Sequence, residues 1–276
     1  MKPPSLTPKL TLKDRLLHRW LRRPYRLHTI DHGGSGPVII LLHGLASSSA
    51  NWEHLIPLLK DSYRCITIDL LGFGESPKPQ WADYTVDDHL RAIHATIRRL
   101  HLKTSYTLVG HSLGSLLATR YAQMHGQRLH RLVLLSPPVY APLYTIQSRT
   151  ARQRTSLYLK AYKYLRSSKR STPENIAKLR RILPQVRFLE LNQDTWVPFV
   201  RSLERCIESQ TLIDDIRHVA TPTDVFFGTL DEVIVPYNVK QLAKIRAVNL
   251  YPLNVHHAVT KRYAAAIARV LHTNKG

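Results

Sequence analysis

Cysteine is scarce in this 276-residue chain: only Cys65 and Cys206 occur, too few for a framework of disulfide bonds. Long apolar runs are also missing, since none approaches the ~18 consecutive apolar residues of a membrane span. The N-terminus has no uninterrupted apolar segment followed by small residues, so we expect no secretory signal. Together these absences favour a reducing, cytoplasmic location.

Acidic residues are few. The chain has 19 Asp and Glu against 40 Lys and Arg, a formal net charge of +21. The excess is concentrated in residues 1–30 and 140–210. Such a field attracts anionic surfaces, whether nucleic acid, phospholipid or an acidic substrate. No nucleic-acid-binding motif accompanies the charge, so we expect no specific nucleic-acid partner. A generally basic, solvated surface is the simpler explanation, and an anionic membrane surface is the alternative partner.

The N-terminal segment 1–24 predicts a basic amphipathic helix. Its apolar residues recur at roughly helical spacing, with Lys and Arg between them. Such a helix can lie on an anionic membrane, which would make the protein peripheral to it. More often the apolar stripe packs against the helix's own domain. The apolar positions are Leu10, Leu12, Leu16, Leu17, Trp20 and Leu21.

The rest of the chain alternates strand and helix patterns around a hydrophobic fraction of 43%, enough for a sizeable core. Buried strands are predicted from continuous β-branched apolar runs, and helices from apolar positions at helical spacing. The predicted strands lie within 25–36, 37–44, 63–68, 105–109, 129–138, 223–232 and 247–253, and the predicted helices at 47–61, 84–101, 113–126, 236–246 and 260–272.

Strands alternating with helices predict an α/β fold, with a mostly parallel central sheet and helices on both faces. The alternation stops over residues 140–215, which are helical, basic and rich in Tyr. This block is interpreted as a helical cap inserted between two core strands. The core then comprises residues 25–139 and 216–276.

Residues able to carry out nucleophilic catalysis follow the predicted strands. Ser112 lies in the pattern Gly-His-Ser-Leu-Gly, Asp231 follows "FFGTL", and His256 and His257 follow "YPLNV". Ligands of parallel sheets bind beyond the carboxyl ends of the strands. A nucleophile, an acid and a base therefore project to one edge, in the order Ser, Asp, His.

Five segments of the chain together resemble the α/β-hydrolase family, and the resemblance spans residues 25–272. They are "LLHGLASSSANW", "IDLLGFGESPKP", "LVGHSLGS", "FFGTLDEVIVP" and the histidines before the last helix. The resemblance implies a nucleophilic Ser112 on a sharp strand-to-helix turn, with a histidine as its base and Asp231 orienting that histidine. It also implies an oxyanion hole made by the N–H groups of Leu45 and Leu113.

The sequence leaves two histidines open as the base. Counting from Pro252 at the strand end favours His256, whereas the small Ala258 before the last helix favours His257. We slightly prefer His257. The resemblance gives His43 and His111 structural roles.

One acid is assigned to a loop rather than to catalysis. Asp69 is expected to hydrogen-bond the "GFGES" loop. No acid follows the strand that ends near Ser136, where some members of the fold carry theirs.

A serine nucleophile favours attack on a carbonyl over the carboxylate chemistry of epoxide hydrolases and haloalkane dehalogenases. The chain looks most like the esterase, lipase-like and meta-cleavage-product hydrolase branch. We therefore predict a serine hydrolase acting through an acyl-enzyme on a carboxylic ester or a related acyl or C–C substrate. The alternatives are a catalytically silent hydrolase-fold binding module and a membrane-peripheral lipid hydrolase.

The partner expected from this chemistry is a small-molecule acyl substrate admitted by the cap. Four aromatic cap residues could line an acyl pocket, although the cap's own core is the commoner place for them. No cofactor or metal is predicted, because the histidines lack paired ligand spacing and "GLASSSAN" is not a phosphate-binding loop. The four residues are Tyr144, Tyr158, Trp196 and Phe199.

Overall fold

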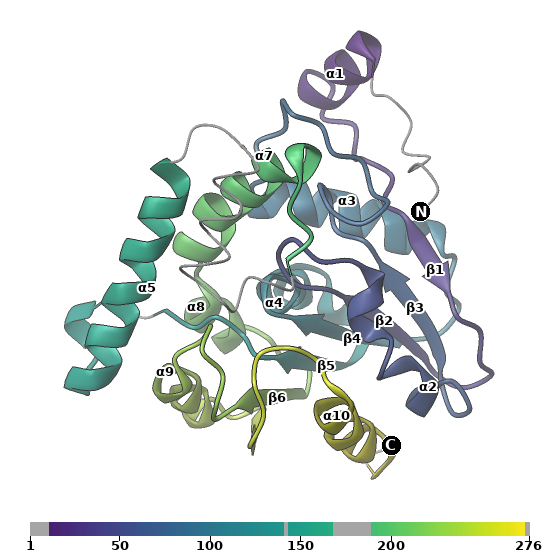
Figure 1. The fold of residues 1–276 in the computed structure, drawn as a ribbon. Coiled ribbons are helices and arrows are strands. Elements are labelled where there is room, and N and C mark those ends of the chain that lie inside the picture. Colours follow the sequence, from purple (N-terminus) through teal and green to yellow (C-terminus); the bar gives the residue numbers. More distant parts are fainter. Residues whose placement is uncertain (1–10, 141–142, 168–188, 274–276) are drawn as a thin grey trace.

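Seven strands form one sheet in a computed structural model that describes residues 11–140, 143–167 and 189–273. The strand order is β1-β3-β2-β4-β5-β6-β7, as Figure 1 shows. β1 pairs antiparallel with β3 and every other pair is parallel, so the predicted mostly parallel sheet is confirmed. The strands are β1 Thr29–Asp31, β2 Val38–Leu42, β3 Arg64–Ile68, β4 Tyr106–His111, β5 Leu129–Leu135, β6 Thr223–Gly228 and β7 Val248–Leu253.

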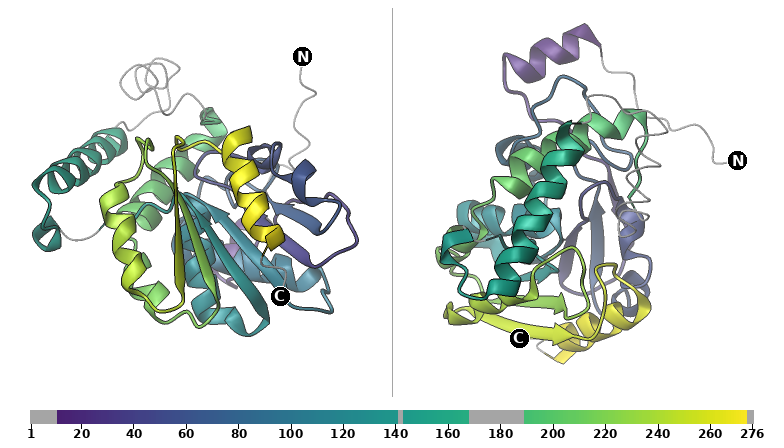
Figure 2. Two further views of the ribbon diagram at one scale, coloured as in Figure 1. Left: turned by 90° about the horizontal axis from the view of Figure 1, so that it is seen from below. Right: turned by 60° about the vertical axis from the view of Figure 1, so that its left-hand side comes forward.

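Helices cover both faces of the sheet (Figure 2). Successive strand residues point to opposite faces. In β2, Ile39 and Leu41 pack in the cluster that contains α2 and α10 residues, whereas Ile40 and Leu42 pack with α3 and α4. The core helices are α2 Ile56–Leu59, α3 Val86–Arg99, α4 Leu113–His125, α9 Pro236–Lys240 and α10 Lys261–Thr273.

The helix predicted over 47–61 is wrong in its extent. The structure has a single 3-10 turn at Ser49–Trp52 and the four-residue α2. Two bonds to Asp69 hold the start of this segment in place, since its Oδ1 accepts from the Ser49 N–H at 2.7 Å and the Ser49 hydroxyl at 2.6 Å. Pro57, which lacks an N–H, is tolerated only in the first turn of a helix, so α2 begins beside it.

Between β5 and β6, the described residues form helices joined by short loops, with no strand among them. They include α5 Arg149–Ser167, α7 Gln193–Ser202, a π-helix at Leu203–Glu208 and α8 Leu212–Arg217. Residues 168–188 of the predicted cap lie outside the described residues. The boundaries at 140 and 215 stay a prediction.

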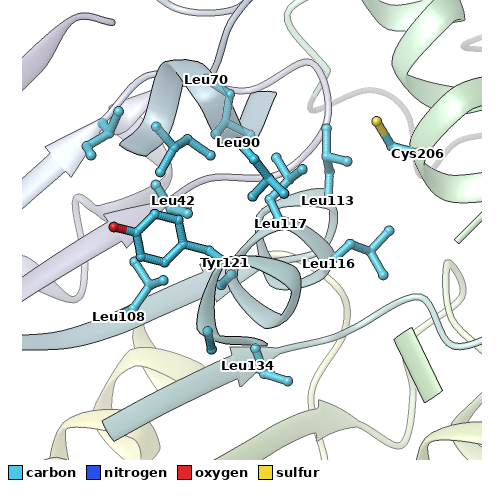
Figure 3. Packing of buried hydrophobic residues seen from close by; sticks show 14 of the residues in the cluster. Leu42, Leu70, Leu90, Leu108, Leu113, Leu116, Leu117, Tyr121, Leu134 and Cys206 are labelled. Carbon is cyan, nitrogen blue, oxygen red and sulfur yellow. The ribbon is translucent and has the colours of Figure 1, made fainter. Parts of the chain in front are cut away.

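The larger core cluster joins the sheet, α3, α4 and the inserted helices, and Figure 3 shows its centre. Cys206 of the π-helix belongs to this cluster together with leucines of α4. Trp196 and Phe199 of α7 belong to it too, so these aromatics are core, the commoner of the two expectations. Tyr144, in contrast, is exposed.

One helix lies in the described part of the predicted N-terminal helix, residues 11–24. It is α1, Leu12–Arg19, and it begins at Thr11 with a capping box in which Thr11 and Asp14 bond each other's backbone N–H. Residues 1–10, including Leu10, lie outside the described residues. Within the described ranges, no helix combines the length and apolar composition needed to cross a membrane.

Candidate active site

Ser112 occupies the turn between β4 and α4 in a strained backbone conformation. Its φ is +52° and its ψ −116°, in a region that residues with a side chain rarely adopt. Such a conformation costs of order 1–3 kcal/mol and persists only where the surrounding structure enforces it. Here the Ser112 N–H donates to the Leu135 carbonyl oxygen of the neighbouring β5 at 2.9 Å.

Two glycines let the chain turn this sharply. A Cβ atom at Gly110 would lie 2.3 Å from the Gly114 carbonyl oxygen, and one at Gly114 would lie 2.2 Å from the Leu42 carbonyl oxygen. Both distances are far below van der Waals contact. Residues 110 and 114 must therefore be glycine for β2, β4 and α4 to pack as they do.

The loop after β2 lies against the serine. A Cβ atom built on Gly44 would be 3.2 Å from Ser112 Cβ, so the residues around Leu45 border the turn. Leu113 is the first residue of α4, and the first N–H groups of a helix have no acceptor within it. The start of α4 and the loop after β2 thus both border Ser112.

His43 orders this loop. Its Nε2 accepts from the Leu70 N–H at 2.9 Å, which leaves the proton on Nδ1 to be donated to the Gly44 carbonyl oxygen at 2.7 Å. Complete burial lowers the pKa of His43, so the ring is neutral. These bonds fit the structural role expected from the resemblance.

Asp231 and His257 form an acid–imidazole pair in which the acid is completely buried and the imidazole half-buried. His257 Nδ1 lies 2.8 Å from Asp231 Oδ2, and the other carboxylate oxygen accepts the N–H groups of Val233 and Ile234. Burial alone would raise the pKa of Asp231, but His257 and the hydrogen bonds outweigh it and hold that pKa below its ordinary value. The ionised carboxylate fixes the proton of His257 on Nδ1, which makes Nε2 the acceptor.

His256 pairs with a different acid. Its Nδ1 lies 2.6 Å from Oε1 of Glu232. The His256 side chain is 62% exposed, against 20% for His257. Two acid–histidine pairs thus lie next to each other, and only the inner one contains the completely buried Asp231. The geometry favours His257 over His256.

His111 connects the serine turn to the histidine loop. Its ring centroid lies 4.8 Å from that of His257, and its Nε2 is 3.0 Å from the His257 carbonyl oxygen. Burial, assisted by the nearby His257, lowers the pKa of His111 to about 3. The neutral ring donates from Nε2 to that carbonyl. His111, the residue before Ser112, therefore holds the backbone of His257 close to the turn of Ser112.

Ser136 is a site residue that the sequence analysis did not find. It directly follows β5 with a φ of +46°, is fully buried, and helps to lower the pKa of the Asp231 carboxyl. Its hydroxyl lies 3.3 Å from the Tyr263 hydroxyl. The signal was its place after a core strand, at the same sheet edge as Ser112 and Asp231. That position was searched only for an acid, whereas the structure has a serine there that supports Asp231.

Helix α5 also contacts the acid turn. Arg154 Nη2 donates to the Asp231 carbonyl oxygen at 2.6 Å, and the Tyr158 hydroxyl donates to the Glu232 carbonyl oxygen. Arg154 Nε donates in addition to the Tyr158 hydroxyl at 2.9 Å. No sequence pattern indicates contacts between segments so far apart along the chain.

Asp69 has the role expected of it. Its Oδ2 accepts the Glu75 N–H of the "GFGES" loop at 2.8 Å. It belongs to loop packing beside the site. Among the described residues, no group of three or more His, Cys, Asp or Glu side chains is arranged to hold a metal ion.

Comparison with known proteins agrees with this geometry. Residues 37–258 match the family model described as the alpha/beta hydrolase fold. The chain belongs to this family.

The curated relatives match over part of their length only. "Probable lysophospholipase BODYGUARD 2" of Arabidopsis thaliana is 44% identical over 108 residues, covering 37% of this chain and 23% of the relative. A 2-hydroxy-6-oxo-6-(2'-aminophenyl)hexa-2,4-dienoic acid hydrolase of Metapseudomonas resinovorans is 35% identical over 105 residues, covering 37% and 36%. The chain thus aligns with less than half the length of either relative.

Among solved structures, the chain is similar to the enol-lactonase from Burkholderia xenovorans LB400. The TM-score is 0.66 at 19% identity, covering 90% of this chain and 95% of that one. At this identity the likeness shows the shared fold.

Proposed function

We propose that this α/β-hydrolase is a serine hydrolase of carboxylic esters, acting through an acyl-enzyme. The observation that carries the proposal is the pair of the buried Asp231 with His257, joined through His111 to the strained turn at Ser112. The relatives named for lysophospholipid and dienoic acid hydrolysis support a carbonyl substrate.

In the first half-reaction, Ser112 Oγ attacks the ester carbonyl carbon while His257 Nε2 takes the hydroxyl proton. The carbonyl oxygen becomes an oxyanion that the N–H groups of Leu45 and Leu113 stabilise. Each such donor typically contributes about 3–4 kcal/mol to transition-state stabilisation. The intermediate then collapses, the proton on His257 passes to the departing alcohol oxygen, and the acyl group stays on Ser112.

In the second half-reaction, water attacks the acyl carbon and gives its proton to His257 Nε2. The second tetrahedral intermediate releases the carboxylic acid as Ser112 Oγ recovers the proton. In both halves Asp231 remains ionised, because its hydrogen bonds and His257 favour the carboxylate, and it stabilises the imidazolium that forms.

The test is hydrolysis of p-nitrophenyl esters of increasing acyl length by the wild type and by Ser112→Ala. We expect turnover by the wild type, a loss of about a thousandfold or more in kcat for Ser112→Ala, and fluorophosphonate labelling of the wild type alone. Equal labelling of the two proteins would contradict Ser112 as the nucleophile.

The alternative is a catalytically silent hydrolase-fold binding module. A wild type that neither turns over an ester or a dienoic acid C–C substrate nor reacts with the probe, while remaining folded, would support that alternative. Turnover of the C–C substrate alone would agree with the proposed triad. It would change the proposed substrate from an ester to a compound whose C–C bond beside a carbonyl group is hydrolysed.

A further inference from the structure

Helix α1 exposes its apolar stripe to solvent. The commoner expectation for such a segment, packing on its own domain, is not what the structure has. Leu12 is 77% exposed and Trp20, the C-terminal cap of α1, is 78% exposed. Leu16 lies between them and is also exposed. Residues four apart lie on one face of a helix, so these three side chains form a continuous stripe.

Basic side chains surround the stripe. Asp14 is the single acid within residues 11–26, and its carboxylate already accepts the Thr11 N–H and hydroxyl, each at 2.7 Å. The patch therefore presents positive charge around an apolar centre. Its exposed cations are Lys13, Arg15, Arg22, Arg23 and Arg26.

The opposite face of α1 contacts the residues that directly follow the helix. The His18 ring stacks on Tyr25 with centroids 3.8 Å apart, and His18 Nδ1 lies 2.5 Å from the Arg23 carbonyl oxygen. Leu17 is half-buried on this same side. Tyr25 in turn packs against the larger core cluster, so this side of α1 faces the protein and the Leu12–Leu16–Trp20 stripe faces outward.

We propose that α1 is a docking helix for an anionic phospholipid bilayer, on which it lies without crossing it. Eight residues give a helix about 12 Å long, far short of a span. Leucine and tryptophan enter the boundary between headgroups and acyl chains, while flanking Arg and Lys pair with anionic headgroups. Nucleic acid would explain the charge but leaves the exposed leucines without a function.

The position of α1 would bring the proposed active-site side towards the bilayer. In Figures 1 and 2, α1 projects from the body of the molecule beside α7 and the loop between β3 and α3. The chain that follows α1 runs along the end of β3, where the His28 N–H donates to the Ser76 hydroxyl at 2.8 Å. That end belongs to the same sheet edge as Ser112.

The experiment uses the Ser112→Ala protein, so that binding is measured apart from hydrolysis and does not rest on the proposed function. It is sedimented with vesicles of phosphatidylcholine alone, or of phosphatidylcholine containing roughly one third phosphatidylserine. We expect it to bind the anionic vesicles, to bind the neutral ones far more weakly, and to release as salt is added.

Two triple variants test the two parts of the patch. Each basic residue near an anionic surface strengthens binding about fivefold, so Lys13→Gln/Arg15→Gln/Arg22→Gln is expected to weaken it about a hundredfold. Leu12→Ser/Leu16→Ser/Trp20→Ser removes exposed side chains, so it should stay folded yet lose binding. The matched charge control, Lys60→Gln/Arg99→Gln/Lys103→Gln, lies elsewhere on the exposed surface and should bind like its parent.

Three outcomes would overturn the inference. One is equal binding of the parent to neutral and anionic vesicles, and another is unchanged binding by both α1 variants. The third is binding to duplex DNA, lost in the charge variant, with no binding to vesicles, which would make the patch a nucleic-acid surface.

Discussion

At the scale of single residues, the site depends on burial more than on residue type. Asp231 and Glu232 are adjacent acids, His256 and His257 adjacent bases, and each acid bonds one histidine. What separates the two pairs is exposure. Asp231 is fully buried and the side chain of its partner His257 is less exposed than that of His256, which strengthens the inner interaction and orients the ring of His257. The exposed outer pair is worth much less.

The neighbouring histidines offer a matched test. His257→Gln is expected to lower kcat by about a thousandfold or more on the best p-nitrophenyl ester, because it removes the proposed base. His256→Gln should stay within a few-fold of the wild type, because it removes only a surface pair. Steady-state kinetics of both variants check this, with circular dichroism to verify folding. The reverse ranking would transfer the role to His256.

The sequence was sufficient to predict Ser112 and Asp231 as candidates, because their motifs place them after strands. It could not decide between His256 and His257, since a one-residue difference in loop path leaves no trace in composition. Ser136 was missed for a related reason: it affects the pKa of an acid that lies 95 positions further along the chain.

At the scale of elements, the inserted helix α5 contacts the backbone of the acid turn. Arg154 and Tyr158 bond the carbonyl oxygens of residues 231 and 232, and Arg154 lies over the Tyr158 ring, with Cζ 5.6 Å from its centroid. The same helix is seated by Ala151, which packs with Ile146 and Val235. This helix of the inserted segment thus supports the turn that presents the carboxylate.

Arg154→Ala is expected to reduce kcat about tenfold with a smaller change in KM, because the acid turn loses a charge-assisted hydrogen bond while substrate contacts remain. Arg154→Lys should recover part of the loss. Arg149→Ala, at an exposed position of the same helix, is the control and should match the wild type. If Arg154→Ala lowers the thermal midpoint but leaves kcat and its pH profile unchanged, α5 has no positioning role.

Elements were predictable where periodicity was strong, as in α3, which the structure has at Val86–Arg99 within the helix predicted over 84–101. The prediction failed over 47–61 because tertiary bonds from Asp69 and the placement of Pro57 overrode the helical spacing. The contacts of α5 were beyond prediction, since they depend on how the insertion folds back over the core.

At the scale of the whole molecule, the buried histidines make the folded state less stable in acid. His43, His89 and His111 are completely buried and their pKa values are lowered chiefly by that burial, to about 4 for His89 and about 3 for His111. The unfolded chain, in contrast, takes up protons near the ordinary histidine pKa of about 6.5. The unfolded state therefore binds more protons as pH falls, so stability is greatest above about 6.5 and decreases below it.

Between pH 7 and 5, His89 and His111 together should lower the free energy of unfolding by about 4 kcal/mol. Urea unfolding across this range measures the slope. His89→Gln, although less stable overall, should show a shallower dependence of the unfolding free energy on pH. The reason is that residue 89 no longer takes up a proton when the chain unfolds. An unchanged slope in that variant would mean that repulsion among the chain's excess positive charges causes the acid sensitivity.

The overall fold was the most predictable level, because alternation of strand and helix patterns restricts the topology to few choices. The antiparallel direction of β1 and the outward stripe of α1 did not follow from the pattern. Both depend on which sheet edge and which surface of the folded core are available to the N-terminal segment.

The positions of the strands in the sheet imply that different parts of the site unfold with different ease. Ser112 follows β4, a central strand whose residues are all buried, whereas His257 follows β7, an edge strand with no fully buried residue. Amide hydrogens in β4 should therefore exchange with solvent only through global unfolding, while those of β7 exchange through smaller local openings. If β7 detaches briefly, His257, the proposed base, moves away from Ser112 while the turn that holds Ser112 stays intact. During these short intervals the central strands would stay folded, but the protein would be inactive because His257 is away from Ser112.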